Sequence, residues 1–179
     1  MKNKNKIKKI TASILTLLIA FFSSTVSNVV SAKTVTFTVT KSSTQTFPSK
    51  KTNTKIYKYI NAYRKTQNAK PVKPKSDLTE MAKVRAKEIS KLFAHKRPNG
   101  KSLIDLAYKK GAGEYDLFGE NLACTKYFSQ INNFEKIIIE GWKKSKAHRR
   151  VMKSKKYKYI GCAYYIKDDM IYICTIYGV

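Results

Sequence analysis

The sequence offers few side chains suited to proton transfer or metal binding, and its only two histidines are His95 and His148. Imidazole can exchange a proton near neutral pH and is a common metal ligand. Both histidines fall in polar stretches just after predicted helix ends, where a solvated histidine, or one that caps the helix, is the simpler interpretation. Glu120 enters a predicted strand that contains Leu122, so its carboxylate should be partly buried and should need a partner.

Three cysteines, Cys124, Cys162 and Cys174, allow at most one disulfide within the chain. Cys162 and Cys174 lie opposite each other in a hairpin centred on Asp168, but a two-residue turn would place them diagonally and strain the bond. A Cys124–Cys162 bridge is one alternative, and three buried, reduced thiols are the other. No pair has the short spacing of a thiolate metal site, so we do not expect a cysteine-bound metal.

The N-terminus has the three parts of a secretory signal peptide. Five lysines precede residue 10, an uncharged apolar run covers residues 10–22, and small residues suited to cleavage follow at 30–32. We predict a signal peptide over residues 1–32, with an uncleaved N-terminal anchor as the alternative. No later stretch is apolar enough to span a membrane, so we expect a secreted protein, soluble after cleavage.

Basic residues outnumber acidic ones, with 37 Lys and Arg against 11 Asp and Glu and a net charge of +26. The predicted leader removes five lysines and no acid, which leaves a charge of about +21 and favours anionic partners. Proteins that recognise nucleic acid phosphates use Arg for its bidentate geometry, and this chain has only five Arg. We therefore expect weak binding to polyanions and no sequence-specific recognition of nucleic acid.

Residues 33–52 form a predicted linker, because they are rich in Thr, Ser and Lys and contain no acid. Val35, Phe37 and Val39 alternate with threonines, so a short strand is the competing interpretation. The folded domain is predicted over residues 53–179. Within it, four segments have the apolar spacing of an amphipathic helix, at about 56–63, 77–95, 102–110 and 132–142.

Capping residues and prolines set the predicted helix ends. Pro71 and Pro74 end the first helix. Three capping pairs open the others: Asp77 with Glu80, Ser102 with Asp105, and Asn132 with Glu135. The last of these helices should bury Phe134, Ile137, Ile138 and Trp142.

The end of the chain has strand composition. Residues 157–166 and 170–177 are rich in Tyr and Ile and flank a turn at Asp168–Asp169, which predicts a β-hairpin. Residues 121–124 can supply a third strand. A small antiparallel sheet with helices on both faces, an α-β-α sandwich of the α+β class, buries these elements best.

Five short motifs occur in an order that resembles a known family. They are Ile60–Arg64, Ala94–Ser102, Gly119–Ala123, Gly141–Arg149 and Ile160–Tyr165. Together they resemble the bacterial branch of the CAP superfamily, also called the SCP domain, which groups cysteine-rich secretory, antigen 5 and pathogenesis-related proteins. The resemblance covers residues 53–178, essentially the whole predicted domain.

The resemblance implies an α-β-α sandwich with a central cleft lined by two His and two Glu, which in many members can hold a divalent metal such as Zn²⁺. Carried over by position, the metal-binding residues would be His95, His148 and Glu120. The second Glu of the animal and plant proteins corresponds to Ser145 here, and Glu140 should face elsewhere. Three ligands without a base, or two ligands and a base, argue against an efficient zinc hydrolase.

The favoured function is therefore a secreted, non-enzymatic CAP-domain binding module at the cell envelope, with a polar cleft for a weakly bound metal or a small ligand. Its charge would attract anionic envelope polymers. A metal-dependent hydrolase of peptide or ester bonds that uses the same cleft is the alternative. A third hypothesis, a nucleic-acid or heparin-like binder, rests on a run of lysines and tyrosines over residues 153–159, for which a solvated strand face is the simpler interpretation.

Overall fold

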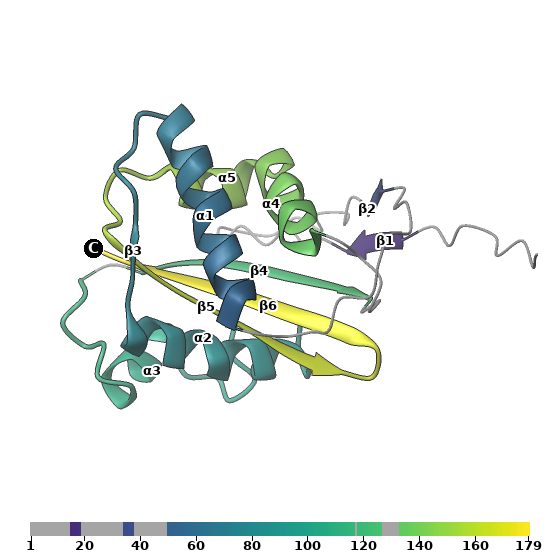
Figure 1. Ribbon diagram of the computed structural model, residues 1–179. Helices are drawn as coiled ribbons and strands as arrows, with labels where there is room; N and C mark the ends of the chain where they lie inside the picture. Colours follow the sequence, from purple (N-terminus) through teal and green to yellow (C-terminus); the bar gives the residue numbers. More distant parts are fainter. Residues whose placement is uncertain (1–14, 19–33, 38–49, 117, 127–132) are drawn as a thin grey trace, which may run out of the picture.

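The computed structural model describes residues 15–18, 34–37, 50–116, 118–126 and 133–179. Helices cover both faces of a central sheet (Figure 1). In chain order the elements are β1 (Leu15–Leu18), β2 (Thr34–Phe37), α1 (Lys50–Thr66), β3 (Lys73–Pro74), α2 (Ser76–Ile89), α3 (Leu103–Lys109), β4 (Phe118–Lys126), α4 (Phe134–Lys144), α5 (Lys146–Lys153), β5 (Tyr159–Lys167) and β6 (Met170–Gly178).

The central sheet has the strand order β3-β5-β6-β4, which makes β4 an edge strand. Strands β5, β6 and β4 are antiparallel, while the two-residue β3 runs parallel to β5. The predicted hairpin is confirmed, and its turn consists of Asp168 and Asp169 with φ of 49° and 57°. Positive φ at both central residues matches the right-handed twist of the flanking strands. The α+β class and the α-β-α sandwich are confirmed, with β3 as a parallel addition to the antiparallel sheet.

The hairpin register decides the state of the cysteines. Cys162 lies opposite Thr175, and Cys174 lies opposite Ala163, so the two thiols point to opposite faces of the sheet. A bond between them is therefore excluded by direction and is not merely strained. Cys124 faces the same side as Cys174, which also excludes the Cys124–Cys162 alternative. All three cysteines are buried thiols outside any disulfide, as the third interpretation expected.

Two apolar cores hold the layers together. On one face, α1, α4 and α5 bury Ile56, Ile60 and Trp142 against the sheet, and the Trp142 indole N–H donates to the Leu122 carbonyl at 3.0 Å. On the other face, α2 and α3 bury a second set of apolar side chains. Gly161 on β5 lets α2 approach closely, because a Cβ at this position would overlap the backbone of Leu78.

Several predicted helix boundaries need correction. Helix α1 begins at Lys50, inside the predicted linker, and α2 begins at Ser76, so Asp77 lies in its first turn instead of capping it. Helix α2 ends at Ile89 rather than near His95. Asn132 lies outside the described residues, and Asn133, with φ of 57°, is the N-cap of α4. The predicted capping box of Ser102 and Asp105 is confirmed at α3.

The buried face of α4 also differs in detail from the prediction. Phe134, Ile138 and Trp142 are buried as expected, but Ile139 replaces Ile137, which is only half-buried. Helix α5 was not predicted as a separate element, although it carries one of the two histidines.

The segments before α1 form a separate two-stranded antiparallel sheet. Strand β1 lies within the predicted leader, and β2 includes Val35 and Phe37, for which the strand interpretation is confirmed. Val39 lies outside the described residues. Among the helices that the structure describes, none combines the length and apolar character needed to cross a bilayer.

Candidate functional site

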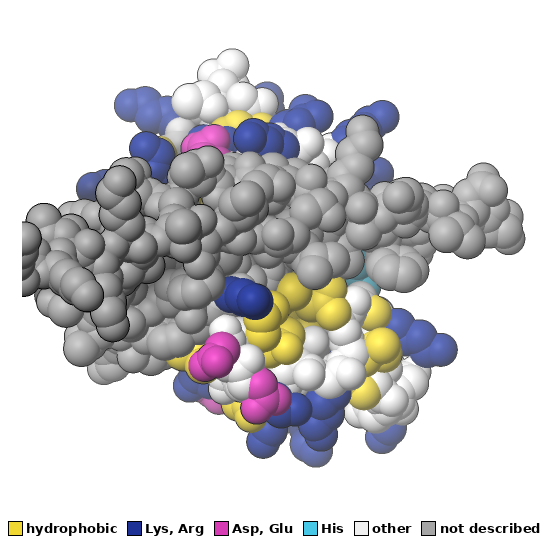
Figure 2. All heavy atoms as spheres, turned by 90° about the vertical axis from the view of Figure 1, so that its right-hand side faces the viewer, with side chains coloured by type: hydrophobic (Ala, Val, Ile, Leu, Met, Phe, Trp, Pro, Cys, Tyr) yellow, Lys and Arg dark blue, Asp and Glu magenta, His cyan; other side chains and the backbone are white. Residues whose placement is uncertain are grey.

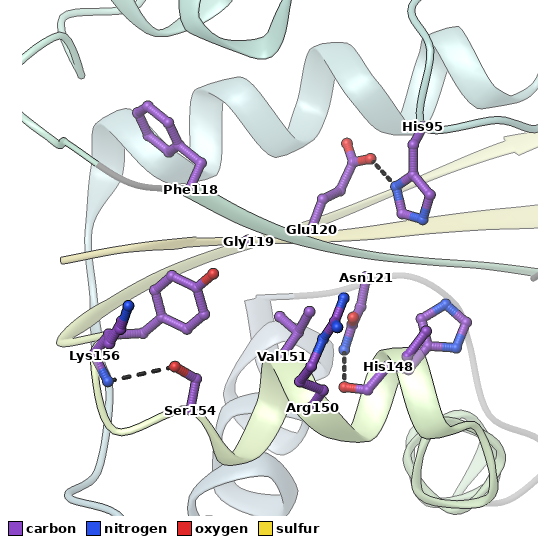
Figure 3. A pocket seen from close by; sticks show the side chains of 12 residues that line it. His95, Phe118, Gly119, Glu120, Asn121, His148, Arg150, Val151, Ser154 and Lys156 are labelled. Atoms are coloured by element: carbon purple, nitrogen blue, oxygen red, sulfur yellow. Dashed lines mark hydrogen bonds and ion pairs between the residues drawn. The ribbon is translucent and has the colours of Figure 1, made fainter. Parts of the chain in front are cut away.

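A cleft of about 450 Å³ runs along the edge strand β4 and contains both histidines and Glu120 in its lining. Strand β4 passes between them (Figure 3). Successive residues of a strand point to opposite faces, so Glu120 faces the α2 layer while Asn121 faces α5. The site therefore brings together the segment after α2, the edge of the sheet and helix α5.

Glu120 is bonded through both carboxylate oxygens. The His95 Nδ1 lies 2.6 Å from Oε2, and the Arg85 Nε donates to Oε1 at 2.7 Å. The Glu120 side chain is 7% exposed, whereas that of His95 is 36% exposed. The expectation that Glu120 is partly buried and paired is confirmed, and its partners fix the orientation of the carboxylate.

Arg85 is the functional residue that the sequence analysis missed. It is fully buried on α2, and it also bonds Glu88 at 2.7 Å and the Ala94 carbonyl at 2.8 Å. Burial alone would lower the pKa of Arg85, but the hydrogen bonds and charges of Glu120 and Glu88 raise it above its ordinary value. Its signal in the sequence is position, because it interrupts the apolar stripe of α2 between Ala82 and Ile89.

A second arginine extends this network into the segment that carries His95. Arg97 binds the Glu88 carboxylate with Nη2–Oε1 at 2.7 Å, and it donates to the Ser102 carbonyl at 3.2 Å. The segment between α2 and α3 has no regular structure, so these charged contacts hold it against α2. His95 thus owes its position to ionic contacts and not to a helix.

His148 is held in the opposite way, by apolar packing and a helix cap. It lies within α5 and is 3% exposed, so its interpretation as a solvated residue beyond a helix end is wrong. Burial, and then the nearby His95, lower the pKa of His148 to about 4, which keeps the ring neutral near pH 7. Asn121 on β4 donates to the His148 carbonyl at 3.2 Å and anchors α5 to the sheet edge.

Ser145, at the position of the second family Glu, has a structural role here. It is buried, and its hydroxyl accepts the His148 N–H at 3.4 Å as the N-cap of α5. Glu140 binds Lys143 on the surface of α4 and does not line the cleft, in agreement with its predicted orientation.

The side chains of the cleft lining best suited to a metal are the imidazoles of His95 and His148. A histidine that bonds a carboxylate through Nδ1 is oriented to offer its other nitrogen to a metal, and Figure 3 shows that nitrogen of His95 on the side of the ring away from Glu120. His148 is neutral, as a ligand must be. Within the described residues, no cluster of three or more His, Cys, Asp or Glu could hold an ion.

Comparison with known protein families decides the membership of this chain. The model of the cysteine-rich secretory protein family, CAP, matches residues 57–177. The chain belongs to the CAP family. The match covers all five motifs in full, and it includes His95, Glu120 and His148. No curated protein matches the sequence significantly.

Solved structures that share the fold of this CAP domain include extracellular and outer surface proteins. An outer surface protein of Borrelia burgdorferi aligns with a TM-score of 0.63 at 17% identity, over 76% of this chain and 98% of its own. An extracellular SCP-domain protein of Bacillus anthracis aligns with a TM-score of 0.56 at 20% identity, over 70% of this chain and 40% of its own.

A further match is NaASP2, whose structure is described with Zn²⁺. It aligns with a TM-score of 0.53 at 15% identity, over 73% of this chain and 80% of its own. At these identities the three likenesses establish the fold alone. The present chain also spans less than half the length of the Bacillus anthracis protein.

Proposed function

We propose that this CAP-family chain is an exported, non-enzymatic binding module of the cell envelope. One observation carries the proposal: Glu120, the only carboxylate among the described residues of the cleft lining, has both oxygens bonded, one to Arg85 and one to His95. A zinc hydrolase needs protein ligands together with a base that activates water. With Glu120 in an orienting role, the described lining of the cleft supplies two histidines and no separate carboxylate base.

The surface supports an envelope role through its charge. Lys and Arg side chains project at the upper and lower borders of the face in Figure 2, where acidic side chains appear in only a few places. Attraction between such a surface and anionic envelope polymers decays with added salt, because mobile ions screen exposed charges. The extracellular and outer surface relatives support the same location.

The cleft supports binding of a divalent metal such as Zn²⁺, or of a small polar ligand. His95 and His148 would hold the metal, and Glu120 would keep His95 in the required tautomer. A metal bound there would supply Lewis-acid polarisation to a ligand oxygen. With only two protein ligands, we expect weaker binding than at a closed four-ligand site.

Calorimetric zinc titration of the purified domain tests the role of each cleft residue. We expect weak binding that is lost in His95→Ala and in His148→Ala, and that weakens by about tenfold in Glu120→Gln because an orienting partner has gone. Zinc binding that is unchanged in both histidine variants would overturn the proposal that His95 and His148 hold a metal in the cleft. Zinc-dependent turnover of peptide or ester substrates that disappears in His148→Ala would instead establish the hydrolase alternative.

Salt elution from isolated envelopes tests the location independently of the metal. The exported protein should be retained at low salt and released as the ionic strength approaches 1 M, where the screening length falls to about 3 Å. Retention that is unchanged by salt would overturn the electrostatic attachment.

A further inference from the structure

A second cavity, of about 470 Å³, opens where β3 pairs with the beginning of β5, and we call it the lysine groove. Four exposed lysines line it: Lys70, Lys73, Lys155 and Lys158. Among the described residues, no Asp or Glu lines the groove, and none forms an ion pair with any of the four lysines. The groove therefore presents four positive charges that the described protein does not neutralise.

A buried arginine beneath the groove fixes the backbone that carries these lysines. Arg64 on α1 is fully buried and donates to the carbonyls of Lys70 at 2.8 Å, Met152 at 2.6 Å, Ser154 at 2.9 Å and Tyr157 at 3.1 Å. The Lys73 N–H also donates to the Lys158 carbonyl at 2.8 Å. The two lysine-bearing segments are thus tied together, and a ligand that bridges them loses less entropy than one that orders a loose run.

The two aromatic rings that line the groove, Tyr157 and Tyr159, already pack against other side chains of the protein. Tyr157 is 8% exposed and packs against Tyr177 with ring centroids 5.4 Å apart. The ring of Tyr159 lies 4.9 Å from the Lys75 ammonium and 5.8 Å from the ring of Tyr115. Single-stranded nucleic acids gain affinity by stacking bases on free aromatic faces. A ligand of this groove therefore gains its affinity from charge and not from stacking.

Apolar anchors for a membrane are also missing from the groove. The large hydrophobic side chains that are exposed in the described part of the chain are Leu92, Ile104 and Tyr108, and none of them lines the groove. Stable attachment to a lipid surface combines charge with buried apolar area. Without such an anchor, the charge of its lysines is the main contribution that the groove supplies, which favours a hydrated polymer over a bilayer.

We infer that the lysine groove binds a flexible polymer whose phosphodiester groups repeat along a backbone without bases, such as a polyol phosphate. Lysine binds phosphate as a compact point charge and does not demand the planar, bidentate geometry that arginine favours. Four such charges on a fixed backbone match a chain of repeating phosphates whose units are otherwise mobile. The inference deepens the proposed function, since it places the contact with envelope polymers at this groove.

Equilibrium binding of a synthetic poly(glycerol phosphate) to the exported chain tests the inference. The groove variant changes Lys70, Lys73, Lys155 and Lys158 to Gln, and the matched control changes Lys87, Lys91, Lys109 and Lys110 to Gln, so that both lose four charges. The groove variant should bind about tenfold or more weakly at low salt, and the control less than about twofold. The slope of log affinity against log salt should fall by about 0.7 for each phosphate contact that is removed.

Each contrary outcome overturns a defined part of the inference. Equal losses in both variants would show that total charge acts without a specific groove, while envelope attachment would stand. Tighter binding of an oligothymidylate or of polyglutamate of equal charge would overturn the ligand class. Binding to phosphatidylglycerol vesicles that exceeds polymer binding would assign the groove to lipid. Absence of polymer binding with salt-sensitive envelope retention would overturn the groove and leave the proposed function intact.

Discussion

The cleft and the lysine groove each rest on a buried arginine, but the two arginines are satisfied in different ways. Arg85 binds two carboxylates, and its pKa is raised despite its burial. Arg64 binds four carbonyl oxygens, and burial lowers its pKa. Two acids therefore offset Arg85 in the network behind the cleft, whereas no acid of the described residues forms an ion pair with the lysines of the groove.

Charged side chains therefore have two different roles in this domain: some pair with one another, and others remain available to a ligand. Behind the cleft, Arg85 and the carboxylate of Glu120 hold each other and set the direction of His95. In the groove, the lysines are positioned by the backbone and remain available to a ligand. Tyr157 lines both cavities, so the two sites share a wall although their electrostatics differ.

Arg85→Met should give the largest effect, because it removes the fully buried guanidinium that pairs with both Glu120 and Glu88. We expect the free energy of unfolding to fall by about 3–5 kcal/mol, the usual cost of breaking a buried charge pair. Urea denaturation measures the loss. The exposed pair of Lys83 and Glu80 is the control, and Lys83→Met should cost less than about 1 kcal/mol. Similar losses in the two variants would contradict a neutralised network in the cleft.

Arg64→Met should cost less, about 2 kcal/mol, because it leaves neutral carbonyls without a donor instead of buried charges. It should also weaken binding of poly(glycerol phosphate), since the segments that carry Lys70 and Lys155 lose their common anchor. Urea denaturation and polymer binding on the same protein measure the two effects. A stability loss as large as that of Arg85→Met would contradict the expectation that charged partners make Arg85 the costlier residue to remove.

The smallest effect should be a dependence of stability on pH that comes from Glu88. Burial raises the pKa of Glu88, but hydrogen bonds from Arg97 and Arg85 outweigh burial and bring it below its ordinary value of 4.5. The unfolded chain therefore binds more protons than the folded one below about pH 4.5, so this stabilisation is present above that pH and is lost as the pH falls. Glu88→Gln should flatten this part of the unfolding curve. An unchanged acid limb would show that Glu88 does not contribute to it.

Local patterns predicted much of the fold because they depend on neighbours in sequence. The capping box at Ser102, the Asp168–Asp169 turn and the apolar stripe through Ile60 follow from hydrogen bonds and periodicity within a few residues. The end of α2 and the separate helix α5 were missed, because packing and ionic contacts from distant segments decided them. The directions of the three thiols depended on the two-residue turn, which sets the register of the hairpin.

The sequence by itself determined the family, the two histidines and Glu120, and the excess of positive charge, since these follow from residue identity and order. Only the tertiary structure decided which of these side chains bond to one another and which are buried. In the folded protein Glu120 is hydrogen-bonded to Arg85 and His95, and His148 is buried within α5. The tertiary structure also paired Arg85 and Arg97 with acids beside the cleft and left the lysines of the groove exposed. Burial and long-range hydrogen bonding make these distinctions, and both depend on contacts between residues far apart in the chain.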